Sequence, residues 1–161
     1  MNPTIRHILV ATDFGSASAQ AIAYAAGIAR GAGARLHLVH VLGRPFTTAG
    51  PYQFHLADTP ARQHRWYERA VAELRRVAAE MDGVEASVEV RDGTVAETLL
   101  KAAVDYGADL VVLGTYHHGV LEQLMGIGIE ERLRRDAPCP VLAVRDRYAA
   151  QALPRQPALV A

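Results

Sequence analysis

Short apolar runs alternate with longer stretches of helical periodicity along almost the whole chain. Ile8, Leu9 and Val10 are consecutive apolar residues, the pattern of a strand covered on both faces. Strands separated by helices predict crossover connections and one parallel sheet. We therefore expect a single-domain α/β fold, a five-stranded parallel sheet with helices on both faces. The predicted strands are residues 5–12, 35–42, 84–91, 110–113 and 141–144.

Turn and capping residues predict the helix boundaries. Ser16 is a candidate N-cap for a first helix that continues to about Arg30 and ends at the glycines before residue 34. Thr59-Pro60 predicts the start of a second helix, which continues to about Met81. Thr94 and Glu97 have the spacing of a capping box, and Gly107 would end that third helix. A fourth helix is predicted from residue 120 to 136. The second helix carries one apolar stripe, formed by Trp66, Ala70, Leu74 and Val77.

Three separated segments carry a resemblance to a known family. The opening Ile8-Leu9-Val10-Ala11-Thr12-Asp13-Phe14, the loop that begins at Gly114, and Ala137-Pro138-Cys139-Pro140-Val141-Leu142 together resemble a bacterial universal stress protein over roughly residues 4 to 146. The resemblance implies a Rossmann-like domain at 1–146, with strand order 3-2-1-4-5, and a tail at 147–161. In that order a ligand crevice forms beyond the carboxyl ends of the first and fourth strands.

The same resemblance suggests a nucleotide site whose motif is degenerate. Members that bind ATP carry Gly-x2-Gly-x9-Gly-(Ser/Thr) in the loop after the fourth strand. In this chain the four positions are Gly114, His117, Ile127 and Gly128. Three of the four depart from the pattern, so we expect weak or absent ATP binding. A shifted cradle that uses Gly119, Gly126 and Gly128 would leave ATP or AMP as an alternative cofactor.

Two residues outside this loop complete the candidate site. The resemblance places Asp13 against the nucleotide and the backbone around Val41 against adenine. Asp13 has an alternative role, since an aspartate in a turn accepts hydrogen bonds from neighbouring backbone N–H groups without any ligand.

Composition narrows the choice of partners and compartment. The chain has 17 basic and 17 acidic residues, so its charge predicts neither nucleic acid nor an anionic membrane as a partner. Its single cysteine excludes an internal disulfide and fits a reducing cytoplasm. No apolar stretch is long enough to span a membrane, and the short stretch before the first strand leaves no room for a signal peptide. We expect a cytoplasmic protein.

Few side chains suggest other chemistry. His117 and His118 are adjacent, but neighbouring residues rarely point at one metal ion and no third ligand lies nearby in the sequence. His37, His40, His55 and His64 could approach a site only through the fold. Cys139 is expected to be a buried structural cysteine, because nothing around it predicts a lowered thiol pKa. No catalytic constellation is evident, so we expect neither an enzyme nor a metal site.

Three functions stay open at this point. The first is a dimeric regulatory module that binds protein partners without high-affinity ATP, assembled as a homodimer through the fifth strand, Val141 to Arg145. The second is an adenine-nucleotide-binding switch. The third is a metal- or redox-responsive module. The long connection at 43–58 is either functional or a variable surface excursion, and the tail is either loosely ordered or docked on a partner subunit.

Overall fold

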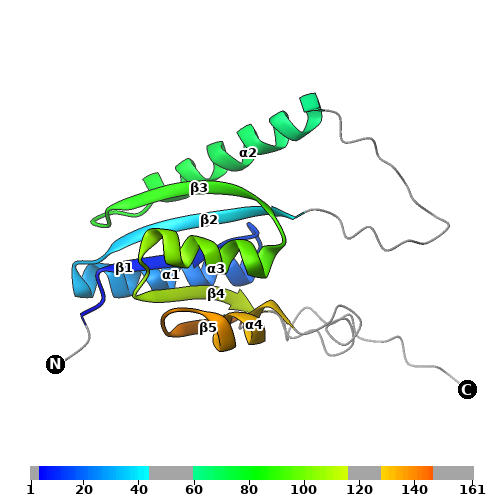
Figure 1. Ribbon diagram of the computed structural model, residues 1–161. Helices are drawn as coiled ribbons and strands as arrows, with labels where there is room; N and C mark the ends of the chain where they lie inside the picture. The colour runs from blue at the N-terminus through cyan, green and yellow to red at the C-terminus, as the bar shows by residue number, and fades with distance from the viewer. Residues whose placement is uncertain (1–3, 44–59, 116–127, 147–161) are drawn as a thin grey trace, which may run out of the picture.

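The strands form one parallel sheet. The computed structural model describes residues 4–43, 60–115 and 128–146. Within these ranges the strand order is β3-β2-β1-β4-β5, as expected, and all pairings are parallel (Figure 1). The strands are β1 (His7–Ala11), β2 (Arg35–Gly43), β3 (Ala86–Gly93), β4 (Leu110–Thr115) and β5 (Val141–Arg145). The carboxyl ends of β1 and β4 therefore lie side by side at the centre of the sheet.

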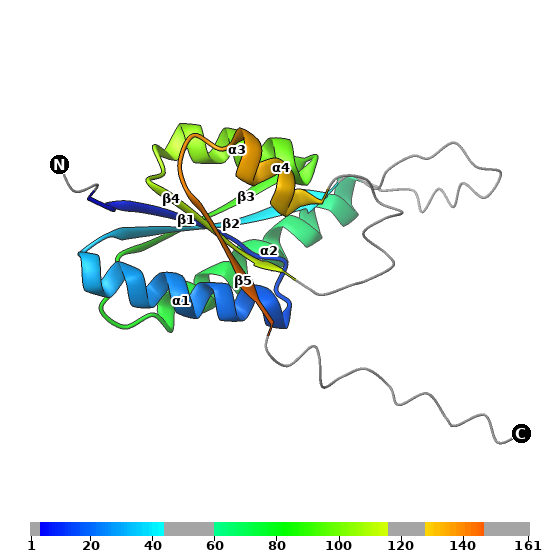
Figure 2. The ribbon, with the colours of Figure 1, turned by 90° about the horizontal axis from the view of Figure 1, so that it is seen from below.

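Helices cover both faces of this sheet. They are α1 (Ser16–Ala32), α2 (Pro60–Ala79), α3 (Val95–Tyr106) and α4 (Ile129–Asp136). Figure 2 shows α1 and α2 on one face and α3 and α4 on the other. None of the described helices is both long and apolar enough to cross a membrane. The predicted fourth helix is found at 129–136; its expected first part, 120–127, lies outside the described residues, as does the tail at 147–161.

Alternation along the central strands divides the core into two layers. Ile8 and Val10 pack with the alanines of α1, while Leu9 between them packs on the opposite face with Leu99 and Leu133. All five of these side chains are at most 2% exposed. This two-sided burial is the reason that β1 reads as a continuous apolar run.

Glycine ends two helices where the sequence predicts it. Gly33 follows α1 with φ 65° and ψ 31°, and Gly107 follows α3 with φ 65° and ψ 45°. Both are left-handed conformations that residues with a Cβ atom rarely adopt.

The predicted N-caps are partly wrong. Gly15, not Ser16, is the N-cap of α1, and the Ser16 hydroxyl bonds instead to Asp146, far along the chain. Thr94 does cap α3, but its side chain makes no capping hydrogen bond. The capping box is absent because Glu97 pairs with Arg132 of α4, at 3.0 Å from Oε1 to Nη2.

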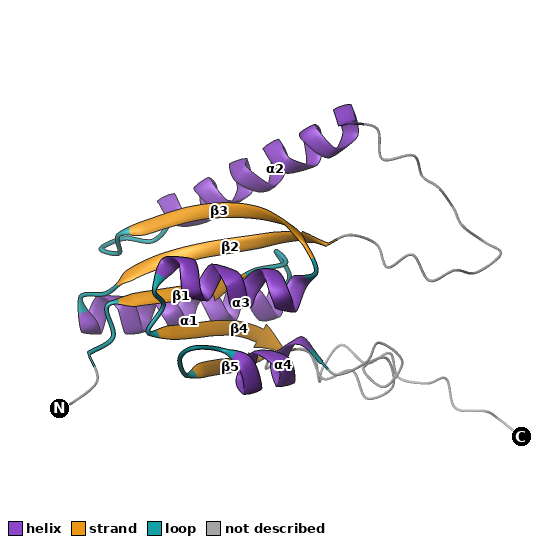
Figure 3. Cartoon of the chain, in the orientation of Figure 1, coloured by secondary structure: helices purple, strands orange, loops and turns teal. Residues whose placement is uncertain are grey.

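The apolar stripe of α2 is only half correct. Ala70 and Leu74 are buried as expected, but Trp66 is 57% exposed. Every residue from 60 to 69 is exposed, and Figure 3 shows these first turns of α2 diverging from the sheet. The periodicity continues beyond the point where the helix has a surface to pack against.

Candidate functional site

The turn between β1 and α1 lies at the carboxyl end of β1, one of the two central strands of the sheet. Asp13 Oδ1 accepts hydrogen bonds from Gly15 N and from the Ser18 hydroxyl, each at 2.8 Å. The Thr12 hydroxyl in turn donates to Ser18 Oγ at 3.1 Å. Asp13 therefore has the local role of a turn-forming aspartate, with one carboxylate oxygen already engaged.

Phe14 has an unusual backbone conformation in this turn. Its φ is 64°, the single positive φ of a non-glycine residue among those described. Its N–H donates to Thr12 Oγ1 at 3.0 Å, and its ring lies 4.5 Å from that of His40, between centroids. A left-handed bulky residue is strained, and such strain persists only where surrounding contacts enforce it.

The ring of His40 is fixed by the same turn. His40 Nδ1 lies 2.8 Å from the carbonyl oxygen of Thr12. Because a carbonyl can only accept, Nδ1 is the donor in this contact. In the neutral imidazole the lone pair is then on Nε2, an acceptor on the side of the ring away from this bond.

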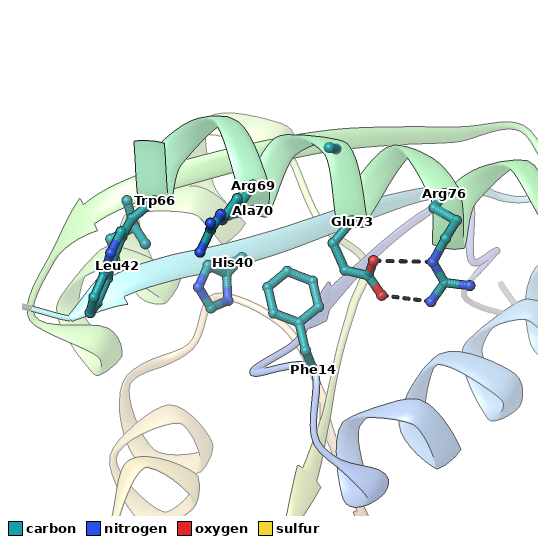
Figure 4. Close-up of a pocket in the computed structure, with 9 residues that line it drawn as sticks. Phe14, His40, Leu42, Trp66, Arg69, Ala70, Glu73 and Arg76 are labelled. Carbon is teal, nitrogen blue, oxygen red and sulfur yellow. Dashed lines mark hydrogen bonds and ion pairs between the residues drawn. The ribbon is translucent and has the colours of Figure 1, made fainter. Parts of the chain in front are cut away.

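A cavity of about 650 Å³ opens beside these two rings, between the end of β2 and α2. Figure 4 shows the Phe14 and His40 rings below α2, with Trp66 and Arg69 on one side and Glu73 and Arg76 on the other. The lining is mainly apolar with charged groups from α2: Phe14, His40, Leu42, Trp66, Arg69, Ala70, Ala72, Glu73 and Arg76.

The charged groups of this cavity are largely paired with one another. Arg76 Nη2 and Nε donate to the two carboxylate oxygens of Glu73 at 2.6 and 3.1 Å, and Nη1 donates to Glu80 at 2.5 Å. The hydrogen bond from Arg76 lowers the pKa of Glu73, and that from Glu73 raises the pKa of Arg76. The position of these charges beside a cavity could be known only from the fold.

Gly114 at the end of β4 is required by packing. A Cβ atom there would lie 2.3 Å from the carbonyl carbon of Ala17 and 2.5 Å from the nitrogen of Ser18. The strand thus contacts the backbone of the first turn of α1 directly. This contact is sufficient reason for a glycine at the first motif position, whether or not a phosphate binds.

Gly128 and the first turn of α4 are the next described residues after the predicted glycine loop. Gly128 is the N-cap of α4, with φ −54° and ψ 149°, and offers no side-chain hydroxyl. Glu130 and Glu131 occupy the first turn. Carboxylates there interact favourably with the helix dipole and repel a second anion.

Comparisons with known proteins decide the family. The model of the universal stress protein family matches residues 4–145. The chain belongs to the universal stress protein family. A universal stress protein of Thermus aquaticus, encoded in the 3' region of a QAH/OAS sulfhydrylase, is 34% identical over 146 residues, which cover 86% of this chain and 97% of the relative.

Solved universal stress protein structures share the fold. That of UspA from Lactobacillus plantarum has a TM-score of 0.64 at 22% identity and covers 89% of this chain and all of its own. A universal stress protein in complex with cAMP has a TM-score of 0.64 at 19% identity, covering 88% of this chain and 98% of its own. At such identities the likeness concerns the fold.

The structure brings together only part of the predicted universal stress protein site. Asp13 and Gly114 lie at the carboxyl ends of the adjacent strands β1 and β4, and Gly114 packs against the backbone of α1. Gly128 precedes α4, which lies on the opposite face of the sheet from α1 (Figure 2). Val41 is near the end of β2, and its side chain packs on the α3 face, whereas the Leu42 side chain lines the cavity. The predicted contact between the backbone of this segment and adenine stays a prediction. Three predicted site residues lie outside the described part of the chain: His117, Gly119 and Ile127.

One functional element was missed from the sequence. Asp146, 8% exposed, accepts hydrogen bonds from the Ser16 hydroxyl and from Gln20 Nε2, the latter at 2.9 Å. Its own N–H donates to the Thr115 carbonyl at 3.2 Å. Asp146 thus fastens the end of β5 to the first turns of α1. Separations of 130 and 126 residues leave no local pattern that would reveal these bonds.

The structure describes some of the histidines and the single cysteine. No group of three or more metal-ligating side chains gathers among the described residues. His118 and His55 lie outside them, and His64 pairs with Glu68 at 3.1 Å. Burial and the charge of Asp109 raise the pKa of the half-buried Cys139 thiol. A raised pKa disfavours the reactive thiolate.

Proposed function

We propose that this universal stress protein is a cytoplasmic, dimeric regulatory module that binds Mg-ATP weakly or not at all and acts through protein partners. The observation that carries the proposal is the amino terminus of α4. Its N-cap, Gly128, has no hydroxyl, and its first turn holds Glu130 and Glu131. A phosphate bound there would lose a side-chain donor and meet two carboxylates.

The magnitudes favour weak binding. A hydrogen bond to a charged group contributes about 1.5–3 kcal/mol, and each 1.4 kcal/mol is about tenfold in affinity. Loss of the hydroxyl alone therefore costs about tenfold to a hundredfold. Asp13 adds to this effect, since its Oδ1 is engaged by Gly15 and Ser18 before any ligand arrives.

Calorimetric titration with Mg-ATP tests this part of the proposal. We expect no saturable heat at micromolar nucleotide, and a low-micromolar dissociation constant would overturn it. The combined change Gly128→Ser, His117→Gly and Ile127→Gly should strengthen binding, and adding Glu131→Gln should strengthen it further. Glu85→Gln, at the far end of the sheet, is the matched control for removal of one carboxylate.

The dimer part rests on β5, an edge strand. Val111 N donates to Pro140 O at 3.0 Å, and Asp146 N donates to Thr115 O at 3.2 Å, so even-numbered residues of this segment direct their backbone groups toward β4. The backbone groups of Val141, Ala143 and Arg145 consequently face the outer edge, which no other strand among the described residues covers. An uncovered edge favours pairing with another strand, and two copies of β5 related by a two-fold axis satisfy it symmetrically.

A pair of proline substitutions tests the dimer at the backbone. Ala143→Pro removes one N–H from the free edge of β5, and should convert the dimer to monomer in sedimentation velocity at micromolar concentration. The control is Ala86→Pro on the opposite edge. There Leu36 N donates to Glu85 O at 2.9 Å, so Ala86 directs its N–H away from β2. A wild-type protein that sediments as a compact monomer would refute the dimer.

A nucleotide switch is the second candidate. It is supported by the structural neighbour solved with cAMP and by the open cavity beside Phe14 and His40. Titration with cAMP and AMP under the same conditions separates the two readings. Micromolar binding of either, with no binding of Mg-ATP, would replace the first proposal by a switch that recognises the nucleoside monophosphate.

A further inference from the structure

A chain of hydrogen bonds joins a serine, a histidine and a glutamate on the α3 face of the sheet, away from the central crevice. His37 of β2 lies opposite Ser87 of the edge strand β3, and its Nδ1 is 2.7 Å from Ser87 Oγ. His37 Nε2 is 3.1 Å from Glu89 Oε2. Ser87 is exposed, whereas the His37 side chain is 12% exposed.

The chemistry of the partners fixes the direction of these bonds. An ionised carboxylate can only accept, so His37 Nε2 carries the hydrogen and donates to Glu89. In the neutral ring Nδ1 then has the lone pair and accepts from the Ser87 hydroxyl. The order is serine O–H to imidazole and imidazole N–H to carboxylate, which is the arrangement that activates a serine nucleophile.

Neighbouring groups hold this arrangement. Burial alone would raise the pKa of Glu89, but the hydrogen bond from His37 and the positive charge of Arg91 outweigh it and lower the pKa, which keeps the carboxylate ionised. Arg91 Nε is 3.0 Å from Glu89 Oε2, and Arg91 Nη1 is 2.8 Å from Asp105 of α3. The Tyr106 ring stacks on His37, with centroids 4.4 Å apart and planes inclined by 20°. The imidazole is thus held on its face and on its Nε2 side.

We propose that Ser87 is an imidazole-activated nucleophile, with His37 as its general base and Glu89 as the group that orients His37, and that it accepts the acyl group of small activated esters. The site is distinct from the crevice of the proposed function and does not depend on it.

The reaction balances within this set of residues. Ser87 Oγ attacks the ester carbonyl carbon while its proton passes to His37 Nδ1. The bond to the leaving alkoxide breaks, and the alkoxide takes that proton from His37. Water, with its proton again accepted by His37, then attacks the acyl-serine. As the acyl–oxygen bond breaks and the acid leaves, His37 returns the proton to Ser87 Oγ.

The test uses a fluorophosphonate probe, whose phosphorus forms a bond to the serine oxygen as fluoride leaves. The chain has three serines, Ser16, Ser18 and Ser87. They differ in exposure and in hydrogen-bond partner, so they serve as controls for one another. Ser16 is exposed but bonded to the carboxylate of Asp146, and Ser18 is buried. Labelling is mapped by mass spectrometry of peptides from the full-length folded protein.

We expect labelling at Ser87 at least about a hundredfold faster than at Ser16, because general-base assistance typically contributes 10²–10⁴-fold. Ser87→Ala should abolish it, and His37→Asn, which retains an acceptor near Nδ1 but no base, should slow it to the rate of Ser16. If His37→Asn fails to fold by circular dichroism, Glu89→Gln replaces it, with a loss of about tenfold expected. Equal rates at Ser16 and Ser87, no labelling of Ser87, or unchanged rates in the folded variant would overturn the proposal.

Discussion

Substitution of Gly114 by alanine tests whether the first motif glycine is explained by packing. The added Cβ would lie 2.3 Å from the carbonyl carbon of Ala17, where 3.4 Å is an ordinary contact. The first turn of α1 must therefore move by about 1 Å. That turn also carries Ser16, which bonds to Asp146, and Ser18, which bonds to Asp13.

The expected loss of stability has two parts. Overpacking typically costs about 1–3 kcal/mol, and each strained hydrogen bond adds about 0.5–1.5 kcal/mol. We expect Gly114→Ala to lower the free energy of unfolding by about 3 kcal/mol in total, a large share of the 5–15 kcal/mol typical of a domain.

Urea unfolding followed by far-UV circular dichroism, at one protein concentration, measures this loss. Gly27→Ala is the matched control, since a Cβ at that position in α1 meets nothing within 4 Å. Alanine at position 27 should raise the free energy of unfolding by about 0.5–1 kcal/mol, because alanine has a higher helix propensity than glycine. The packing argument would be refuted if the free energy of unfolding of Gly114→Ala were within about 0.5 kcal/mol of the wild-type value, which is roughly the precision of such comparisons.

Two further predictions concern the core and the pH dependence. Leu133→Ala should lower the free energy of unfolding by about 2–5 kcal/mol, because Leu133 is fully buried between α4 and the sheet. Ile129→Ala on the same helix should lower it much less, since Ile129 is 44% exposed. The urea midpoints of the two variants check this. Hydrogen bonds from the Arg6 and His7 N–H groups lower the pKa of Asp109. The folded pKa is below the unfolded one, so this stabilisation is present above about pH 4 and is lost as the pH falls through the folded pKa. Asp109→Asn should therefore reduce stability at pH 7 but not at pH 2, and an equal loss at both pH values would contradict the assignment.

The sequence predicts the sheet well because its signals are local. Ile8 to Val10 marks a strand buried on both faces, and Gly33 and Gly107 end helices through their own backbone preference. The order of the strands came from family resemblance, since periodicity alone does not say which strands are neighbours.

Features that join distant segments could not be predicted in the same way. Trp66 shares the period of Ala70 and Leu74, yet it is exposed because α2 diverges from the sheet. The bonds of Asp146 to Ser16 and Gln20, and of His37 to Ser87 and Glu89, exist only once strands and helices are placed in space. In the crevice, the sequence correctly gives the turn role of Asp13 as an alternative, whereas the packing role of Gly114 requires the position of Ala17.

The two ends of the parallel sheet have unequal scope for change. At the amino end of the strands the connections are short, and left-handed Gly33, Gly83 and Gly107 stand in them. At the carboxyl end, by contrast, the long segments 44–59, 116–127 and 147–161 follow β2, β4 and β5 directly (Figure 1). The described residues of both core layers lie outside these segments, so we expect exchanges there to alter specificity at one end of the sheet while the other end preserves the fold. Grafting the segment 44–59 of a relative between Gly43 and Pro60 is the direct engineering use of that asymmetry.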